Sequence, residues 1–185
     1  MALKMKKALI ICTSPRSGSN STLLASQFAA GAEDAGLSVE TVLLADSEPG
    51  FCQACYYCLS HSGQCFQQDI MNSIREKLVE ADVLVFATPV YFYGMRGQMK
   101  TFIDRTIAFY KRIAAREVYL IATSGDPRSS AVDGTIKGLQ GFIECLGDGA
   151  KLAGVVLGTG VSEAGDARHS AAYDEAYQMG RSIQP

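Results

Sequence analysis

Short hydrophobic runs alternate with amphipathic stretches along the chain. Four runs are nearly continuous in hydrophobic residues and predict strands over 6–14, 82–90, 117–125 and 153–160, and a fifth strand is predicted over 38–46, where polar and hydrophobic residues alternate before the run becomes hydrophobic. Five stretches repeat hydrophobic residues at helical spacing and predict helices over 21–35, 70–81, 97–110, 136–146 and 164–182. This alternation predicts an α/β fold with three layers, in which helices cover both faces of a doubly wound, five-stranded parallel sheet. The length of 185 residues suits a single domain over 1–185.

Individual residues are expected to limit or orient these elements. Gly36 should stop the first helix, Asp69 should cap the second, and Pro89 should end the third strand. The helix over 97–110 is expected to turn four hydrophobic residues inward, namely Met99, Phe102, Ile103 and Ile107.

Composition narrows the classes of function. The chain is 48% hydrophobic and 19% charged with a formal net charge of −2, so no basic surface is expected to attract nucleic acid or an anionic membrane. No stretch is long enough to span a bilayer, and the apolar run at 8–12 is too short for a signal peptide. We therefore expect a cytoplasmic protein whose thiols stay reduced.

A doubly wound sheet binds ligands beyond the carboxyl ends of its strands, which draws attention to three loops. The first loop, 13–22, joins a strand to a helix, where free backbone N–H groups favour an anion. It lacks both the Gly-Lys-Ser/Thr of a Walker loop and the G-x-G-x-x-G of a dinucleotide site. Its polar side chains suit the phosphate of a monoester, although they could also form an ordinary helix cap; they are Ser14, Arg16, Ser17, Ser19, Asn20, Ser21 and Thr22.

The second and third loops complete the predicted pocket. Tyr91, Phe92 and Tyr93 lie past the third strand beside Gly94, and they offer a flat hydrophobic wall to a planar ligand. Gly125, in the third loop at 123–130, could bring backbone N–H groups to the edge of a ring, although an ordinary turn would look the same. A phosphate loop and an aromatic wall at one sheet edge describe a flavin mononucleotide (FMN) site.

Three segments of the sequence resemble the NAD(P)H-dependent FMN reductase family of flavodoxin-like proteins, and most closely its iron–sulfur flavoprotein branch. They are "SPRSGSNST", "CQACYYC…GQC…QDI" and "TPVYFYGMRGQMKTFIDR". The resemblance implies a flavodoxin-like fold with strand order 2-1-3-4-5, bound FMN, and a homodimer or homotetramer. It implies that the isoalloxazine ring lies against Pro89, Val90, Tyr91, Phe92, Tyr93 and Gly94 on one side, with Thr123, Ser124 and Gly125 at its other edge. Arg96 departs from the small residue that the family often has.

The loop over 45–68 concentrates thiols in a C-x2-C-x2-C-x6-C pattern, formed by Cys52, Cys55, Cys58 and Cys65. The first part matches the spacing of bacterial ferredoxins, and the resemblance implies a [4Fe–4S] cluster. Zinc, two reversible disulfides and plain loop thiols remain as alternatives. The other two thiols, Cys12 and Cys145, are expected to be small buried hydrophobes.

The remaining charged and imidazole side chains receive no catalytic role. His61 could be a metal ligand but is expected to be a solvated loop residue, and His169 is left unassigned. Lys100 and Arg105 could steer a nicotinamide phosphate, although we expect them to form a solvated helix face. Flavin chemistry needs orientation more than acid–base groups. We therefore expect an oxidoreductase that takes electrons from NAD(P)H, or from a carrier such as ferredoxin, and passes them to a quinone, flavin, oxygen or peroxide. The alternatives are a flavodoxin-like electron carrier and a thiol redox sensor.

Overall fold

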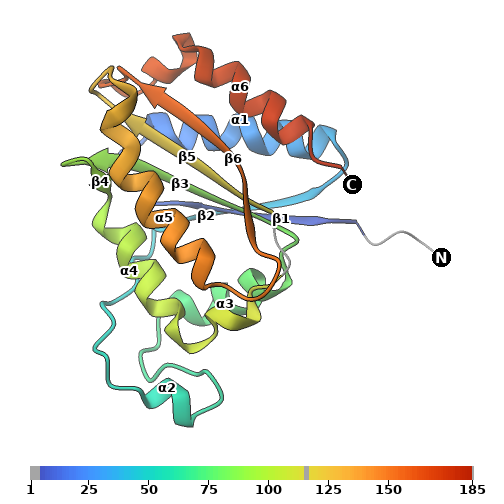
Figure 1. The fold of residues 1–185 in the computed structure, drawn as a ribbon, viewed down its shortest axis with the longest axis vertical. Coiled ribbons are helices and arrows are strands. Elements are labelled where there is room, and N and C mark those ends of the chain that lie inside the picture. Colours follow the sequence, from blue (N-terminus) through green and yellow to red (C-terminus); the bar gives the residue numbers. More distant parts are fainter. Residues whose placement is uncertain (1–4, 115–116, 185) are drawn as a thin grey trace.

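The computed structural model describes residues 5–114 and 117–184. Five strands form a parallel sheet in the order β2-β1-β3-β5-β6, and the short β4 pairs antiparallel with β3 (Figure 1). The strands are β1 (Lys7–Cys12), β2 (Ser38–Leu43), β3 (Val83–Tyr91), β4 (Gly94–Met95), β5 (Glu117–Ser124) and β6 (Lys151–Thr159). The α/β fold class is confirmed. The predicted order 2-1-3-4-5 describes the five parallel strands, and the structure differs by the additional strand β4.

Helices cover both faces of the sheet. One face is covered by α1 (Asn20–Asp34) and α6 (Ala171–Arg181), and the other by α3 (Met71–Glu80), α4 (Gly97–Arg105) and α5 (Asp133–Cys145) (Figure 1). Successive residues of β1 face opposite layers: Ile10 packs in the core under α1 and α6, whereas Ile11 packs in the core under α3, α4 and α5. The short α2 (Tyr57–Ser60) lies within the loop that carries four cysteines between β2 and α3, away from the sheet.

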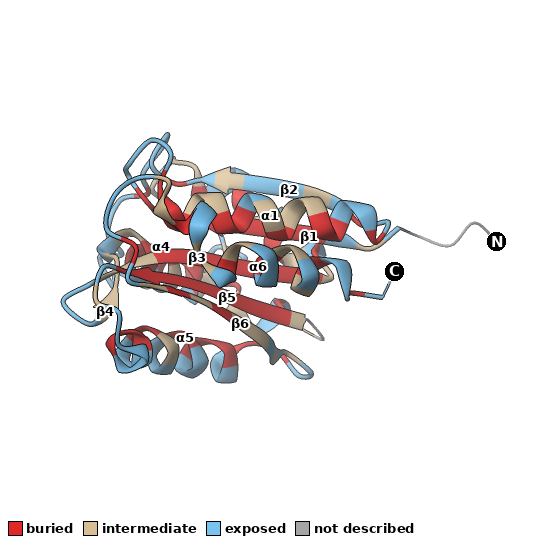
Figure 2. Cartoon of the chain, turned by 90° about the horizontal axis from the view of Figure 1, so that it is seen from above, coloured by how far each residue is buried: buried red, intermediate tan, exposed pale blue. Residues whose placement is uncertain are grey.

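The central strands are buried on both faces, while the edge strand β2 is mostly exposed (Figure 2). The layer of α1 and α6 is held unusually close at two glycines. A Cβ atom on Gly31 would clash with the carbonyl oxygen of Tyr177, and one on Gly180 would clash with that of Phe28. The two helices can pack at this distance only because both positions lack a side chain.

The expectation that Pro89 ends the third strand is wrong. Pro89 pairs with Thr123 of β5, and β3 continues to Tyr91, where β4 becomes its partner. Because β1 pairs with β3 no further than Ala87, the missing N–H group of Pro89 removes no ladder bond to β1.

Two predicted helices are shorter than expected. The helix over 97–110 ends at Arg105, where the Thr106 hydroxyl donates to the carbonyl oxygen of Ile103 at 2.7 Å, and 3₁₀ turns follow. The turns rotate Ile107 outward, so its side chain is exposed rather than buried. The helix over 164–182 is likewise divided, because Ser170 is extended between a 3₁₀ turn at Asp166–His169 and α6.

The prediction that Gly36 stops the first helix is confirmed, since Gly36 follows α1 with a φ of 92°. Asp69 is not the N-cap of the second helix: Ile70 holds that position, and the Asp69 carboxylate, one residue earlier, accepts from the Met71 amide at 3.0 Å. Among residues 5–114 and 117–184, no helix is long and hydrophobic enough to cross a membrane.

Candidate functional site

Three loops follow adjacent strands at one edge of the sheet. β1, β3 and β5 are neighbours in the sheet, so their carboxyl ends place the predicted loops 13–22, 88–98 and 123–130 side by side. The structure therefore brings together the three segments that the sequence singled out.

The first loop presents the N-terminus of α1. Ser19 is the N-cap, and its hydroxyl oxygen accepts from the Thr22 amide at 3.3 Å. The N–H groups of Asn20 and Ser21 lie in the first helical turn, where no intrahelical partner exists. The Ser21 hydroxyl is also buried without a hydrogen-bond partner among the described residues. A cluster of unpaired donors at a helix N-terminus suits an anion such as a phosphate.

Asn20 has hydrogen-bond partners that the sequence did not indicate. The Asn20 amide donates to the carbonyl oxygens of Val161 and Glu163, and its oxygen accepts from the amides of Gly165 and Ala167. Asn20 thus joins α1 to the loop that follows β6, and its backbone N–H remains for a phosphate.

Arg16 also contacts the loop after β6. Its Nη1 atom donates to the carbonyl oxygen of Ser162 at 2.9 Å, and its Nη2 atom lies 4.0 Å from the Glu163 carboxylate. The guanidinium is half exposed, so it could turn toward a phosphate without leaving a buried acceptor unpaired.

The aromatic segment forms a tight hairpin between β3 and β4. Phe92 and Tyr93 occupy its two turn positions with φ angles of 49° and 61°, in the left-handed region that bulky side chains rarely adopt. Phe92 is completely exposed, and Tyr91 and Tyr93 are about half exposed. The sequence predicted the aromatic wall but not its strained backbone, which holds large rings outside the core.

The third loop is bonded to the hairpin through Arg128. Its Nη2 atom donates to the Tyr93 hydroxyl at 3.0 Å and to the Asp126 carboxylate at 2.5 Å. Hydrogen bonds from the Arg128 side chain and backbone lower the pKa of Asp126 to about 2, so its carboxylate is charged at neutral pH. Within the same loop, the Ser124 hydroxyl oxygen accepts from the Asp126 amide at 3.1 Å.

Arg96 links the first two loops and was not predicted to do so. Its Nη1 atom donates to the Thr13 carbonyl oxygen, and its Nη2 atom contacts the Glu48 carboxylate at 3.3 Å. The Arg96 amide donates to the Thr88 hydroxyl at 3.2 Å. The side chain is only 13% exposed, so Arg96 is part of the framework between the strand ends.

The four cysteines of the cysteine loop, which we define as residues 51–68, line one open groove of about 720 Å³ beside α4 and α5. Cys52 and Cys55 are exposed, Cys65 is half-buried and Cys58 is buried. Burial, followed by the neighbouring thiols, raises the pKa of Cys58. Within the described ranges, no three His, Cys, Asp or Glu side chains converge as metal ligands.

The prediction that Cys145 is buried is wrong, whereas that for Cys12 is confirmed. Cys145 is the last residue of α5, and it is exposed on the same groove as the cysteine loop. Cys12 lies at the end of β1 with 1% of its surface exposed, and burial raises its pKa to about 12.

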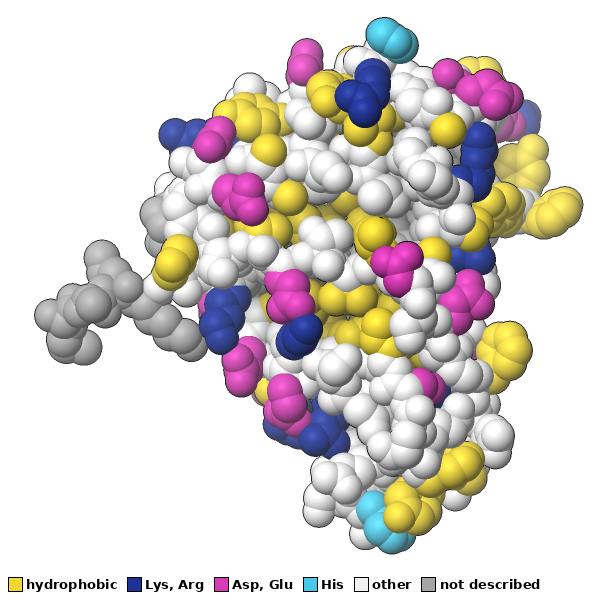
Figure 3. Space-filling view, turned by 180° about the vertical axis from the view of Figure 1, so that it is seen from behind, with side chains coloured by type: hydrophobic (Ala, Val, Ile, Leu, Met, Phe, Trp, Pro, Cys, Tyr) yellow, Lys and Arg dark blue, Asp and Glu magenta, His cyan; other side chains and the backbone are white. Residues whose placement is uncertain are grey.

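The cysteine loop also carries a hydrophobic surface. Hydrophobic side chains gather at the lower end of the molecule in Figure 3, where this loop lies. Its exposed members are Phe51, Tyr56, Tyr57, Leu59 and Phe66, and the His61 ring stacks on Tyr57 with 3.6 Å between the ring centroids.

Arg105 bonds to both ends of the cysteine loop, at Gly50 and Asp69, which we call the neck of the loop. The prediction that Arg105 is solvated is wrong. Its side chain is 1% exposed and forms an ion pair with Asp69, with Nη1 at 2.6 Å and Nη2 at 3.1 Å from the two carboxylate oxygens. Nη1 also donates to the Gly50 carbonyl oxygen at 2.8 Å. Because Gly50 and Asp69 flank residues 51–68, one guanidinium on α4 ties both ends of the loop together.

Electrostatics favour the charged form of both partners in this pair. Burial alone would lower the pKa of Arg105, but the hydrogen bonds and charge of Asp69 raise it overall. Burial alone would raise the pKa of Asp69, but the bonds from Arg105 and from the Gly50 and Met71 amides lower it overall. Lys100, on the same helix, is exposed as predicted and pairs with Asp104.

Comparisons with known proteins agree with this arrangement. Residues 6–135 match the family described as NADPH-dependent FMN reductase. The chain belongs to this family. An iron–sulfur flavoprotein from Archaeoglobus fulgidus is 33% identical over 61% of this chain and 51% of that protein, and one from Methanosarcina thermophila is 26% identical over 78% and 79%. The solved structure of the Trp repressor binding protein from Bacillus subtilis is 27% identical over 94% and 99%, with a TM-score of 0.64. The chain spans about half the length of the first of these relatives.

The three strand-end loops fit the cofactor that the family name implies. The unpaired N–H groups and the orphaned Ser21 hydroxyl provide donors for a phosphate, and the hairpin provides aromatic surface for a ring. The four cysteines share a groove, but they do not converge in the described structure, so binding a cluster would require the loop to rearrange.

Proposed function

We propose that the chain is an FMN-dependent oxidoreductase that passes electrons from NAD(P)H, or from a reduced carrier protein such as ferredoxin, to a small acceptor. The observation that carries this proposal is the meeting of three loops at the ends of β1, β3 and β5. The loop after β1 offers anion-binding donors, and the loop after β3 offers aromatic surface. The loop after β5 offers polar groups held by hydrogen bonds, such as the Ser124 hydroxyl that accepts from the Asp126 amide. This combination matches the phosphate and the tricyclic ring of FMN.

Each loop has a distinct task in this proposal. The phosphate is held by the first loop, through backbone N–H groups and through side chains of the predicted set Ser14, Arg16, Ser17, Ser19, Asn20, Ser21 and Thr22. The ring lies against Pro89, Val90, Tyr91, Phe92, Tyr93 and Gly94, with Thr123, Ser124 and Gly125 at its far edge. When bound, FMN supplies the electron-transfer chemistry.

The surrounding residues orient the ring and exclude water. Arg128 holds the Tyr93 hydroxyl at 3.0 Å and thereby fixes one wall of the pocket. Arg96 fixes the Thr13 carbonyl oxygen and so holds the first loop against β3. The Asp126 carboxylate is charged at neutral pH, and both of its oxygens accept hydrogen bonds from Arg128, so it holds Arg128 against the Tyr93 hydroxyl and does not act as a proton source.

Two finer elements belong to the same proposal. Cys52, Cys55, Cys58 and Cys65 bind a [4Fe–4S] cluster after the cysteine loop rearranges, which their shared groove and the ferredoxin-like spacing support. A homodimer or homotetramer covers the exposed hairpin, where Phe92 is otherwise entirely in solvent.

Calorimetry with FMN and with riboflavin tests the cofactor. FMN should bind about tenfold or more tightly than riboflavin, because only FMN engages the donors of α1. Equal affinities would refute the phosphate loop, and no binding of either compound would refute the proposal.

A second measurement separates an enzyme from an electron carrier. NADPH or NADH should bleach the flavin absorbance of the loaded protein rapidly under anaerobic conditions. Reduction by ferredoxin alone would support the carrier. Iron and acid-labile sulfide, counted in protein purified without air, decide whether the cysteines hold a cluster.

A further inference from the structure

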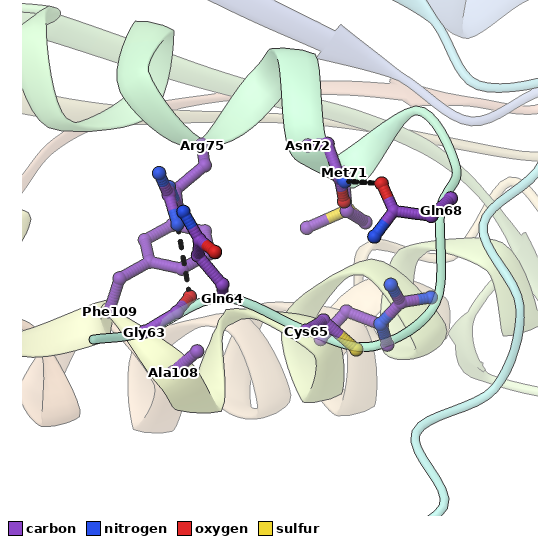
Figure 4. A pocket seen from close by; sticks show the side chains of 10 residues that line it. Gly63, Gln64, Cys65, Gln68, Met71, Asn72, Arg75, Ala108 and Phe109 are labelled. Carbon is purple, nitrogen blue, oxygen red and sulfur yellow. Dashed lines mark hydrogen bonds between the residues drawn. The ribbon is translucent and has the colours of Figure 1, made fainter. Parts of the chain in front are cut away.

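A second, polar cavity lies beneath the cysteine loop. It has a volume of about 270 Å³ and opens between the loop, the start of α3 and the turns after α4 (Figure 4). The residues that line it are Gly63, Gln64, Cys65, Gln68, Met71, Asn72, Arg75, Arg105, Ala108 and Phe109. This set includes two arginines and three amides but neither Asp nor Glu, so the wall is rich in hydrogen-bond donors.

One wall holds a buried donor without a partner. The two terminal nitrogens of Arg105 are occupied by Asp69, Gly50 and Gln67. Its Nε atom is fully buried and forms no hydrogen bond of good geometry within residues 5–114 and 117–184, and the Cys65 thiol lies close enough to the guanidinium to contribute to the raised pKa of Arg105. Buried donors in folded proteins nearly always have a partner. An unpaired guanidinium nitrogen in the wall of a polar cavity therefore points to an acceptor that occupies the cavity.

Arg75, on α3, adds a second guanidinium to the lining of the cavity. Its Nη1 atom donates to the Gly63 carbonyl oxygen at 3.2 Å, as the dashed line in Figure 4 shows, and its Nε atom donates to Glu76 at 2.8 Å. Its Nη2 atom has no partner among the described residues. These two bonds hold the guanidinium in place at the cavity with donor capacity unused.

The amides add further donors. Asn72 donates to the Gln68 side-chain oxygen at 2.7 Å, which fixes the orientation of Gln68 and leaves the Gln68 –NH₂ group free. Gln64 lies beside Arg75 in Figure 4. Gln64, Gln68 and Asn72 are exposed, so this side of the cavity is open to a ligand from solvent.

We propose that this cavity binds a small oxyanion, as the carboxylate or phosphate group of a small molecule, between Arg75 and Arg105. Two guanidinium groups with unused donors and several amides match an oxyanion, whose oxygens only accept. The site is separate from the first loop, because none of its residues belongs to 13–22. It does not depend on the FMN proposal, and it concerns the chain without a cluster, because Gly63, Gln64 and Cys65 line the cavity in the present conformation of the loop.

The anion would also affect the cysteine loop. Gly63, Gln64 and Cys65 form one side of the cavity, and the neck residue Arg105 forms another. An occupant that bonds to both would connect the loop to α4. We therefore expect anion binding to slow hydrogen exchange of the backbone amides over 61–67.

A matched pair of arginine variants tests the site. Arg75 and Arg112 both contact the Glu76 carboxylate, but only Arg75 lines the cavity. The probes are inorganic phosphate, sulfate and malonate, titrated by calorimetry into the full chain saturated with FMN, so that a flavin phosphate occupies the first loop. Arg75→Gln should weaken binding about tenfold or more, since it removes a charged donor, while Arg112→Gln should change binding less than about twofold.

The outcomes are distinct. Tighter binding of phosphate and sulfate identifies a phosphate-type ligand, and tighter binding of malonate identifies a carboxylate. No binding by the wild-type chain, or equal weakening by the two variants, overturns the proposal. If Arg75→Gln does not fold, Gln68→Leu replaces it as the cavity variant with the same expected direction. If FMN does not bind, phosphate can occupy the first loop as well, and the contrast between Arg75→Gln and Arg112→Gln still reports on the cavity alone.

Discussion

The three loops that we propose to bind FMN at the ends of β1, β3 and β5, called the flavin loops below, and the cysteine loop are positioned by different means. The flavin loops leave adjacent strands, so the register of β1, β3 and β5 fixes their relative positions before any side chain contributes. The cysteine loop leaves the sheet after β2, contains only the single turn of α2, and is closed at its neck by one buried ion pair. A site built on strand ends can tolerate side-chain changes, whereas the position of the cysteine loop depends on the Arg105–Asp69 ion pair.

The largest effect on the free energy of unfolding is expected from breaking the Arg105–Asp69 ion pair. Arg105→Met removes the guanidinium, so the Gly50 carbonyl loses this donor and the Asp69 carboxylate keeps only its hydrogen bonds from the Gly50 and Met71 amides. Breaking a buried ion pair from one side typically costs about 3–5 kcal/mol, and Asp69 retains some solvent contact, so we expect about 3 kcal/mol in the free energy of unfolding from urea titration. Limited proteolysis should cut the cysteine loop faster than it cuts any flavin loop.

Lys100→Met is the control on the same helix. Its pair with Asp104 is exposed, so its loss should change the free energy of unfolding by about 0.5 kcal/mol or less. If the two variants are equally stable, the ion pair does not hold the loop.

This contrast also explains what the sequence could predict. Hydrophobic periodicity located the sheet and its three ligand loops, because strand ends follow from topology. It misassigned Arg105, since an arginine beside Asp104 on an amphipathic helix has the same pattern whether it is solvated or paired with Asp69 across the fold. The role of Asn20 in joining α1 to residues 161–167 was missed for the same reason: its partners lie far away in the sequence.

A smaller effect is expected at the hairpin of the proposed flavin site, where the backbone is strained. Phe92 and Tyr93 occupy positions that favour Asn and Gly. The double variant Phe92→Asn/Tyr93→Gly should raise the free energy of unfolding by about 1 kcal/mol and weaken FMN binding, because it relieves the backbone and removes the ring surface. The control is Tyr173→Phe on α6, which should change neither quantity. A double variant that binds FMN as well as the wild type would show that the aromatic wall does not contact the ring.

The Arg105–Asp69 pair should also give a dependence on pH. The pKa of Asp69 is lower in the folded protein than in the unfolded chain, so its contribution is complete above the unfolded value of 3.8. That contribution is lost as the pH falls through the lower, folded pKa. Urea titrations below pH 4 should therefore show a loss of stability in the wild type that is reduced in Asp69→Asn. Parallel curves for the two proteins would assign the acid sensitivity to other carboxylates.

The smallest perturbation of the fold, alkylation of the six thiols, compares the two regions directly. Near pH 8 Cys12 should stay unmodified in the folded protein, because burial at the end of β1 raises its pKa to about 12. Cys145 and the exposed thiols Cys52 and Cys55 should react rapidly with iodoacetamide, and Cys58 more slowly because it is buried and its pKa is raised. Mass spectrometry of timed samples gives the rate at each site, and addition of urea should release Cys12. In protein purified without air, a bound cluster would protect the four thiols of the cysteine loop while Cys145, outside the motif, continued to react. If Cys145 and the loop thiols react equally fast in that preparation, the loop holds free thiols, and the flavin site must work without a cluster.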